Sequence, residues 1–298
     1  MVTESQFISW FPISILCAFT LATADALTKK FFSDYTDWQL LVIRFVAPGL
    51  LLLPFIVINP LPPVPPLFWL LILFLIPLEF LAMWLYMVAI RDNPLHLTLP
   101  YLAFTPVFNI LTAYISLGET VSFSGFAGIF LVVAGAFFLN IDQKQPLGLK
   151  SVLTPFAAII KIRGSRLMLG VALIYSVASV LGKMAVQLST PASFGPFYFA
   201  VLGTVALGIT LLRKSEDVAI LMARWKQAFL VGAFMAVMIV THFIAIAQVE
   251  VAYFISLKRT SLLFGILYGA LFFKERHLGR HFLAGLLMIA GVALIVVI

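Results

Sequence analysis

The sequence predicts an all-α integral membrane protein in which ten transmembrane helices form two inverted five-helix repeats. Three observations support this prediction. Of the 298 residues, 63% are hydrophobic and only 10% are charged, whereas soluble domains are about 45–50% apolar and about 25% charged. A soluble fold of this length could not bury so much apolar surface. The apolar residues also form long uninterrupted runs, and the two halves of the chain share a pattern.

Ten segments are long and apolar enough to cross a bilayer, which takes roughly 20 residues per helix. Helices are expected because a lipid-exposed backbone must satisfy its own hydrogen bonds. The runs also lack the apolar and polar alternation of barrel strands. The ten segments cover residues 7–28, 38–58, 67–90, 95–117, 121–139, 167–188, 192–212, 227–248, 251–273 and 278–298.

The connections divide the chain into two halves. The segment 59–66 is too rich in proline for a helix, because proline lacks the backbone donor that a helix needs. The longest connection is polar and basic and lies near the middle of the chain. We therefore expect a first five-helix repeat at residues 1–140, a linker at residues 141–166 and a second five-helix repeat at residues 167–298.

Short sequence matches connect the two halves. A shift of 156 residues places Gly118-Glu119 on Lys274-Glu275 and Thr105 on Ser261, and a shift of 154 places Lys29 on Lys183. Two repeats with an odd number of helices must sit inverted in the membrane. Inverted repeats of this kind are common among secondary transporters.

At these positions the chain resembles the drug/metabolite transporter superfamily, and specifically its ten-helix EamA branch. The residues that carry the resemblance are Arg44-Phe45, Pro100, Pro106, Leu117-Gly118-Glu119, Gly125, Gly128, Gly135, Phe272-Phe273-Lys274-Glu275, Gly285 and Gly291. The resemblance covers nearly the whole chain. It implies a basket of ten helices around a central cavity, alternating access, and export or import of small metabolites.

The loop charges predict the orientation in the membrane. The loops on the same side as both termini contain no Lys or Arg, whereas the opposite side carries Lys29, Lys30, Arg91, Lys144, Lys150, Lys161, Arg163, Arg166, Arg213, Lys214, Arg224, Lys226, Lys274, Arg276 and Arg280. Basic loops favour the cytoplasm. We therefore expect a multi-pass protein of the plasma (inner) membrane with both termini outside and the 141–166 loop cytoplasmic, although EamA proteins usually keep both termini in the cytoplasm.

Charged residues inside the hydrocarbon layer are costly and usually face an interior cavity. Glu79 follows Pro77 near the middle of its segment, so it is a candidate for proton coupling or substrate contact. The alternative is a structural ion pair with Arg44 or Lys258. Tyr86 follows Glu79 by seven residues and shares its helix face, which makes it the best aromatic candidate for the cavity.

Further candidates divide between functional and structural roles. Arg44 is more simply explained by an ion pair with Asp25. Lys258 and Arg259 cannot share a helix face at 100° per residue, so one of two stripes should line the cavity. Tyr253 shares the Arg259 stripe, and we favour the Lys258 stripe as the cavity lining.

His242 and Lys183 complete the candidates. His242 could take part in coupling, or it could be a neutral side chain bonded to Thr241 or a carbonyl. Lys183 could bind a ligand or extend to the membrane interface. The candidate substrate-binding or coupling residues are thus Glu79, Lys258, Tyr86, Arg44, His242, Tyr253, Arg259 and Lys183.

Several classes of function have no support in the sequence. There is no nucleotide-binding P-loop, no metal-ligand spacing of His or Cys and no serine nucleophile motif. We therefore expect no catalytic residues, no metal, no cofactor and no enzyme activity. The absence of a basic domain outside the membrane argues against nucleic acid as a partner.

The charges within the membrane segments predict the kind of cargo. Arg44, Lys183, Lys258 and Arg259 exceed Asp25 and Glu79 by two positive charges. This excess favours a substrate with a carboxylate or phosphate. The leading hypothesis is a secondary transporter, and more specifically an exporter, of a small polar metabolite such as an amino acid or organic acid, with protons as the coupling ion. The alternatives are a lipid-linked substrate carrier or flippase, and a non-transporting membrane enzyme or scaffold.

Overall fold

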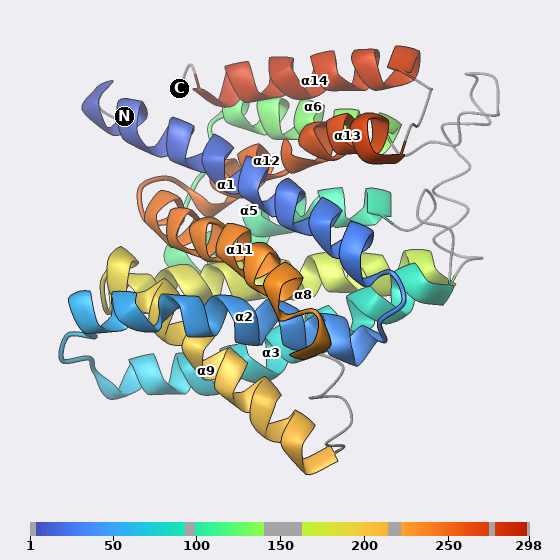
Figure 1. Cartoon of the computed structure of the whole chain (residues 1–298). Helices are drawn as coiled ribbons and strands as arrows, with labels where there is room; N and C mark the ends of the chain where they lie inside the picture. The colour runs from blue at the N-terminus through green and yellow to red at the C-terminus, as the bar shows by residue number, and fades with distance from the viewer. Residues whose placement is uncertain (1–3, 93–98, 140–162, 214–221, 274–277, 297–298) are drawn as a thin grey trace.

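The computed structural model describes residues 4–92, 99–139, 163–213, 222–273 and 278–296, and all of its regular elements are helical (Figure 1). The first half contains α1 (Glu4–Phe32), α2 (Asp37–Ile58), α3 (Pro66–Asp92), the 3-10 helix η1 (Leu99–Phe104), α5 (Thr105–Leu117) and α6 (Phe123–Leu139). The second half contains α8 (Arg163–Gln187), α9 (Pro191–Arg213), α11 (Trp225–Ile246), α12 (Val251–Lys258), α13 (Ser261–Phe273) and α14 (Leu278–Val296).

Six of the described helices are long and apolar enough to span a membrane: Trp10–Phe32, Asp37–Ile58, Pro66–Tyr86, Arg163–Gln187, Pro191–Arg213 and Trp225–Ile246. Shorter apolar helices cover Tyr101–Leu117, Phe123–Ala136 and Ala284–Val296. The all-helical membrane fold expected from the sequence is therefore present, and the count of ten crossings stays a prediction.

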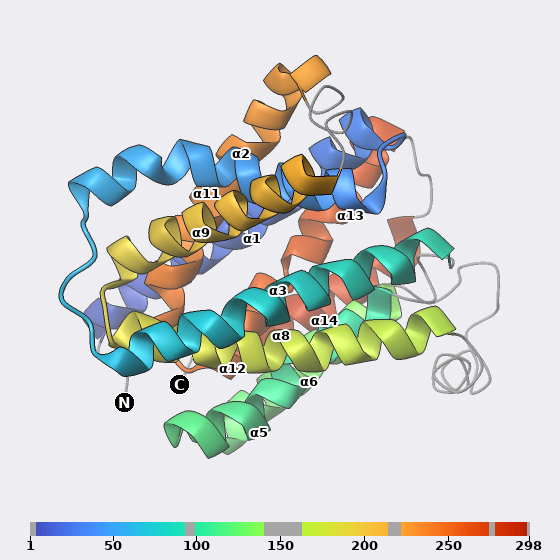
Figure 2. The same ribbon diagram turned by 90° about the horizontal axis from the view of Figure 1, so that it is seen from below.

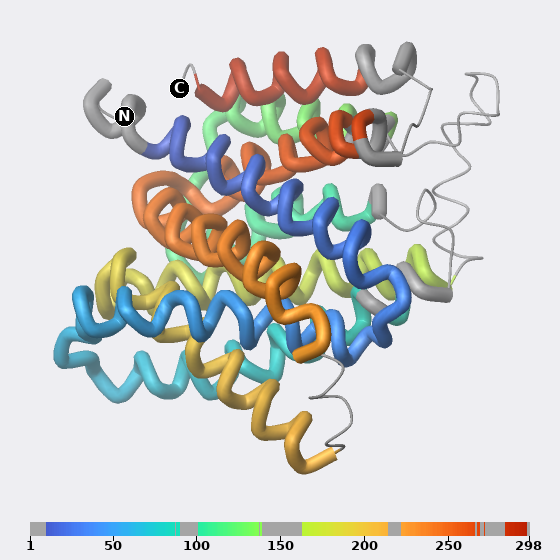
Figure 3. The backbone as a smooth tube through the Cα atoms, in the orientation of Figure 1, coloured from blue at the N-terminus to red at the C-terminus, as the bar shows by residue number. Residues whose placement is uncertain are grey.

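The helices run between two ends of the molecule, which we name by what they carry. The termini face holds both chain ends and the connections at residues 59–65, 118–122, 188–190 and 247–250 (Figure 1). The basic face, at the opposite end, holds the connection at residues 33–36. The path of the chain in Figure 3 shows that α1 runs from the termini face to the basic face and α8 runs the other way. Corresponding helices of the two halves are thus antiparallel, as inverted repeats require.

Helix packing follows the symmetry of the two repeats. The most extensive contacts join α6 with α14, α2 with α9, α1 with α11 and α3 with α8. In an inverted repeat, α2 corresponds to α9 and α6 to α14. The symmetry operation that relates the repeats therefore maps each of these two pairs onto itself. The pairs α1–α11 and α3–α8 are exchanged with one another. The main contacts are therefore those that a pseudo-two-fold axis in the membrane plane would generate.

Glycines allow the close approach at both self-related pairs. A Cβ on Gly128 of α6 would lie 2.6 Å from the carbonyl oxygen of Gly291 in α14. A Cβ on Gly49 of α2 would lie 2.7 Å from the carbonyl oxygen of Phe199 in α9. Contacts between small residues are a main source of helix association in membranes, because lipid gives no hydrophobic driving force between helices.

One pair of contacts departs from the symmetry. Helix α2 packs along α11, whereas the corresponding helices α3 and α9 have almost no close backbone contact. They meet through side chains near the termini face, where Phe68 packs on Phe194 at a centroid distance of 6.1 Å and the Tyr198 hydroxyl donates to the Leu75 carbonyl at 3.2 Å. Figure 2 shows the two helices separating from that end. The contacts between the two repeats therefore depart from the symmetry, and α3 and α9 meet near the termini face.

Candidate functional site

The predicted continuous helix at residues 251–273 is wrong, because the structure breaks it between α12 and α13. The turn at Arg259 and Thr260 keeps short-range backbone bonds, including Leu262 N–H to the Arg259 carbonyl at 3.0 Å. Thr260 Oγ1 also donates to the Leu257 carbonyl at 2.7 Å. Hydroxyl groups that bond backward to carbonyls bend membrane helices. The polar residues of this segment therefore change its direction without leaving its backbone unpaired.

A second irregular segment occupies the corresponding place in the first half. The predicted helix at residues 95–117 is a 3-10 helix, η1, followed by α5, and residues 95–98 lie outside the described residues. Thr105 begins α5 and Ser261 begins α13, and both helices have 13 residues. The Arg259 guanidinium donates to Thr105 Oγ1 at 2.7 Å. The two breaks, which lie 156 residues apart in sequence, thus meet in the interior.

A group of charged residues surrounds this meeting point, and we call Asp25, Arg44, Glu79, Lys258 and Arg259 the central charged cluster. Arg44 forms the predicted ion pair with Asp25. The Arg44 side chain is 9% exposed and that of Asp25 is 48% exposed, so this pair borders open space. The cluster is supplied by α1, α2, α3, the last residue of α12 and the break that follows it.

Glu79 is half-buried, and within the described ranges its carboxylate makes no hydrogen bond and no ion pair. It does interact electrostatically with Lys258. Lys258 in turn has its Nζ 2.9 Å from Nδ1 of His242 on α11. The structural alternative of a direct Glu79 ion pair with Arg44 or Lys258 is therefore absent from the described structure. His242 is bonded to Lys258 rather than to Thr241.

Tyrosines connect the charges across the interior. Tyr86 of α3 interacts electrostatically with Asp25, Arg44 and Arg259. Tyr175 of α8 interacts with Glu79, Arg44 and Arg259. The structure thus places Tyr86 with the central charged cluster, where the sequence expected it, and adds Tyr175.

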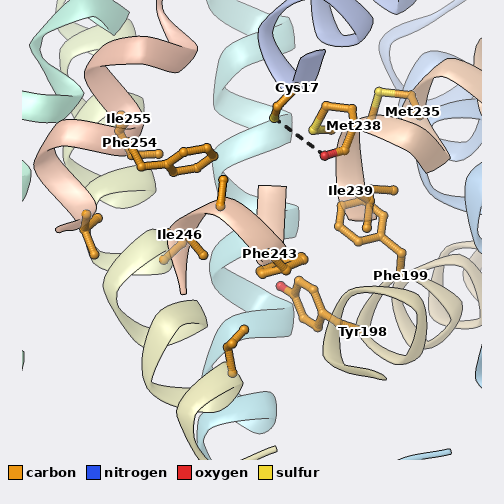
Figure 4. Packing of buried hydrophobic residues seen from close by; sticks show 14 of the residues in the cluster. Cys17, Tyr198, Phe199, Met235, Met238, Ile239, Phe243, Ile246, Phe254 and Ile255 are labelled. Atoms are coloured by element: carbon orange, nitrogen blue, oxygen red, sulfur yellow. Dashed lines mark hydrogen bonds between the residues drawn. The ribbon is translucent and has the colours of Figure 1, made fainter. Parts of the chain in front are cut away.

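An aromatic layer lies between this cluster and the termini face. His242 packs edge-on against Phe243 and Phe254, with a centroid distance of 4.8 Å in each case. Phe243 also meets Phe194 at 4.8 Å. Figure 4 shows Phe243 beside Tyr198, with Phe254 and the buried Cys17 in the same view, and the Cys17 Sγ lies 3.6 Å from the Met238 carbonyl oxygen. These aromatic contacts join α9, α11 and α12 on this side of the central charged cluster.

Lys183 lies away from the central charged cluster, beyond the aromatic layer. Its Nζ is 2.5 Å from Glu119 Oε1 and donates to the Val249 carbonyl at 2.7 Å. The second carboxylate oxygen of Glu119 accepts from the Val251 N–H at 2.8 Å. We call these four groups the Lys183–Glu119 latch. It fastens α8, the α5–α6 connection and the start of α12 together at the termini face.

Tyr253 also lies near the termini face. Its hydroxyl accepts from the Ser122 N–H at 3.0 Å, and its ring covers Gly125. Of the residues selected from the sequence, the structure brings Glu79, Tyr86, Arg44, His242, Lys258 and Arg259 together and places Lys183 and Tyr253 elsewhere. The roles of all eight remain predictions.

Sequence reasoning missed Tyr175, Thr105 as a partner of Arg259, and Glu119 as a partner of Lys183. The only sequence signal for the last two was their position in the matched segments of the two halves. Tyr175 is one aromatic residue among many and carries no such signal. Within the described residues, no group of three or more His, Cys, Asp or Glu side chains is arranged to hold a metal ion.

A separate apolar groove lies on the outer surface between α2 and α9. It is lined by Ile56, Phe197, Ala200, Val201, Thr204 and Val205. None of these residues belongs to the central charged cluster, and the groove is almost entirely apolar. It suits a hydrocarbon chain of the surrounding bilayer rather than a polar molecule.

Comparison with known proteins agrees with this architecture. A sequence model of the EamA-like transporter family matches residues 8–141 and matches again at residues 162–297. A protein crystal structure with 16% sequence identity aligns with a TM-score of 0.72, covering 98% of this chain and 96% of that chain, which shows a shared fold. No curated protein matches the chain at a significant level. The chain, a multi-pass membrane protein with two copies of the family's repeat, belongs to the EamA-like transporter family.

Proposed function

We propose that this protein is a secondary transporter that moves a small polar metabolite, such as an amino acid or organic acid, across the plasma membrane by alternating access. The observation that carries the proposal is the central charged cluster at the meeting point of two broken helices. Charges inside the membrane are expensive and mark substrate or ion pathways. Broken helices at the interface of inverted repeats are where secondary transporters bind their substrates.

The unequal packing of the two repeats supports alternating access. Towards the termini face the interior is closed by the aromatic layer and the Lys183–Glu119 latch. Towards the basic face, Asp25 remains half exposed and α3 and α9 stand apart. The described conformation therefore suits access from the basic face. Transport requires the opposite arrangement to form as well.

We propose Glu79 as the residue that couples transport to protons, because it is an ionisable interior group without a direct partner. The test uses purified protein in liposomes with an imposed pH gradient and a panel of radiolabelled amino acids and organic acids. Flux of a panel member should depend on the gradient in the wild type and lose that dependence in Glu79→Gln. Glu250→Gln, which changes a loop carboxylate at the termini face, should behave as the wild type. Gradient-independent wild-type flux, or normal coupling in Glu79→Gln, would reject the coupling role.

We further propose that the basic face is cytoplasmic, that both termini are outside and that the physiological direction is export. The basis is the loop charge distribution together with the access from the basic face described above. A reporter fused to the C-terminus that is active only in the cytoplasm should give no signal. A strong signal would reverse the orientation and the expected direction.

The apolar groove between α2 and α9 favours a second candidate, a carrier or flippase of lipid-linked substrates. An acyl chain could occupy the groove while a headgroup entered the interior. A fluorescent phospholipid in the same liposomes distinguishes the two functions. Accelerated movement of the lipid between leaflets, without metabolite flux, would replace the first proposal with the second.

A further inference from the structure

We propose that the transported molecule is an organic acid with one net negative charge, and that Arg259 binds its carboxylate. The inference rests on the proposed transport function and narrows its substrate class. It depends on which charges of the membrane interior already have compensation within the protein and which do not.

Two of the four interior cations are compensated by direct ion pairs. Arg44 is paired with Asp25. Lys183 is paired with Glu119 and also donates to a backbone carbonyl. Glu119 was not counted among the interior acids in the sequence analysis. Its pairing with Lys183 reduces the expected excess of two positive charges to one.

A third cation has a neighbouring acid without direct contact. Lys258 interacts electrostatically with Glu79, and its Nζ also bonds His242. The formal charges of Lys258 and of a deprotonated Glu79 cancel. No net charge remains from this pair.

Within the described membrane segments, Arg259 is the fourth of these cations, and the pairings above leave it without an acidic partner. Its hydrogen bond is to a neutral hydroxyl, Thr105 Oγ1, at 2.7 Å. Its Nε is buried without a hydrogen-bond partner. Its electrostatic neighbours Tyr86 and Tyr175 have phenol side chains, which carry no charge at neutral pH. Leaving a charge uncompensated in the membrane interior is costly, so the site is completed by an anion of charge minus one.

The geometry of the guanidinium favours a carboxylate. Arginine presents a planar set of donors that bind carboxylates in a bidentate way. The bond to Thr105 fixes the orientation of the plane, and Nε, which is buried, has no hydrogen-bond partner among the described residues. Thr105 is therefore a positioning residue for Arg259. A zwitterion would leave the positive charge uncompensated, and a dianion would replace it with a negative one.

The test measures binding and flux for matched series of small molecules on two carbon skeletons. The probes are propanoate, alanine, propanamide and succinate, with phenylpropanoate, phenylalanine and phenylpropanamide as the larger series. Thermal unfolding of the purified protein reports binding, because a ligand that binds only the folded state raises its stability. The monoanions should give the largest shifts, and the same compounds should show flux in liposomes.

Variants then test whether Arg259 is the residue that binds the carboxylate. Arg259→Gln should weaken monoanion binding by roughly tenfold to a hundredfold, the range expected for hydrogen bonds to a charged group. Arg213→Gln, which removes an exposed arginine at the end of α9, should leave binding unchanged. Thr105→Val should weaken binding and Thr105→Ser should restore it, because the serine keeps the hydroxyl that orients Arg259.

The outcomes separate the inference from the proposed function. Stronger binding and flux of the zwitterions, the amides or succinate would overturn the charge inference while leaving transport intact. Monoanion binding that is unchanged in Arg259→Gln would overturn the role of Arg259. Absence of flux for every compound together with lipid movement between leaflets would remove the transport proposal itself.

Discussion

The Lys183–Glu119 latch gives a quantitative prediction about closure of the termini face. Glu119 makes two charge-assisted contacts, to Lys183 Nζ at 2.5 Å and to the Val251 N–H at 2.8 Å. A hydrogen bond to a charged group contributes about 1.5–3 kcal/mol. Glu119→Gln keeps an acceptor of the same shape but loses the charge, so we expect it to weaken the closed state by about half of the combined value, roughly 1.5–3 kcal/mol.

The population that is open to the termini face should rise accordingly. Because 1.4 kcal/mol corresponds to a factor of ten, the open fraction should increase by roughly ten- to a hundredfold. Ser256 of α12 is fully buried beneath this closure. The chain has one cysteine, Cys17, so Ser256→Cys in a Cys17→Ala background places a single thiol there. Its rate of reaction with a hydrophilic maleimide should follow the open fraction.

Two controls define the result. Glu250→Gln changes the carboxylate at the N-cap of α12. The Glu250 side chain makes no capping hydrogen bond, so this variant should leave the labelling rate unchanged. Lys183→Met should accelerate labelling as Glu119→Gln does, and the double variant should add little, since both remove the same pair. A labelling rate in Glu119→Gln equal to that of the parent would refute the assignment of the latch as a closure.

Two further predictions concern stability. Gly128→Val should lower the unfolding temperature through a cost of about 1–3 kcal/mol for overpacking, because a Cβ there meets the Gly291 carbonyl, whereas Gly170→Ala, with no atom within 4 Å, should be tolerated; equal effects would contradict the close contact. At the basic face, the hydrogen bond from Arg224 holds the pKa of Asp34 below its usual value. Its stabilising contribution should therefore be complete above the ordinary aspartate range and disappear as the pH falls through the lowered pKa. Asp34→Asn should remove that part of the acid dependence measured by thermal unfolding, and an unchanged acid profile would count against the pairing.

Much of the fold was predictable because membrane helices are specified by composition. Long apolar runs, proline-rich connections and the matched halves predicted the helical repeats. The Arg44–Asp25 pair was also predictable, because two lone charges on neighbouring helices have few other ways to avoid lipid.

The breaks and the pairings were not predictable in the same way. The turn at Arg259 is stabilised by backbone and hydroxyl bonds within an apolar sequence that is equally compatible with a continuous helix. The partner of Lys183 lies 64 residues away, in the connection between α5 and α6. Such contacts depend on how the helices assemble around the axis, which no single segment encodes.

The difference between the α2–α11 and α3–α9 contacts has a consequence for the shape of the opposite state. Since the axis exchanges the α2–α11 and α3–α9 contacts, the alternating access proposed above predicts an opposite state in which these two contacts have changed places. This exchange would bring α3 against α9, separate α2 from α11 and turn the opening to the other side. In the proposed opposite state, the helices of the first half would make the contacts that the corresponding helices of the second half make in the described structure. A disulfide that locks α2 to α11 should therefore arrest the protein in the orientation described above.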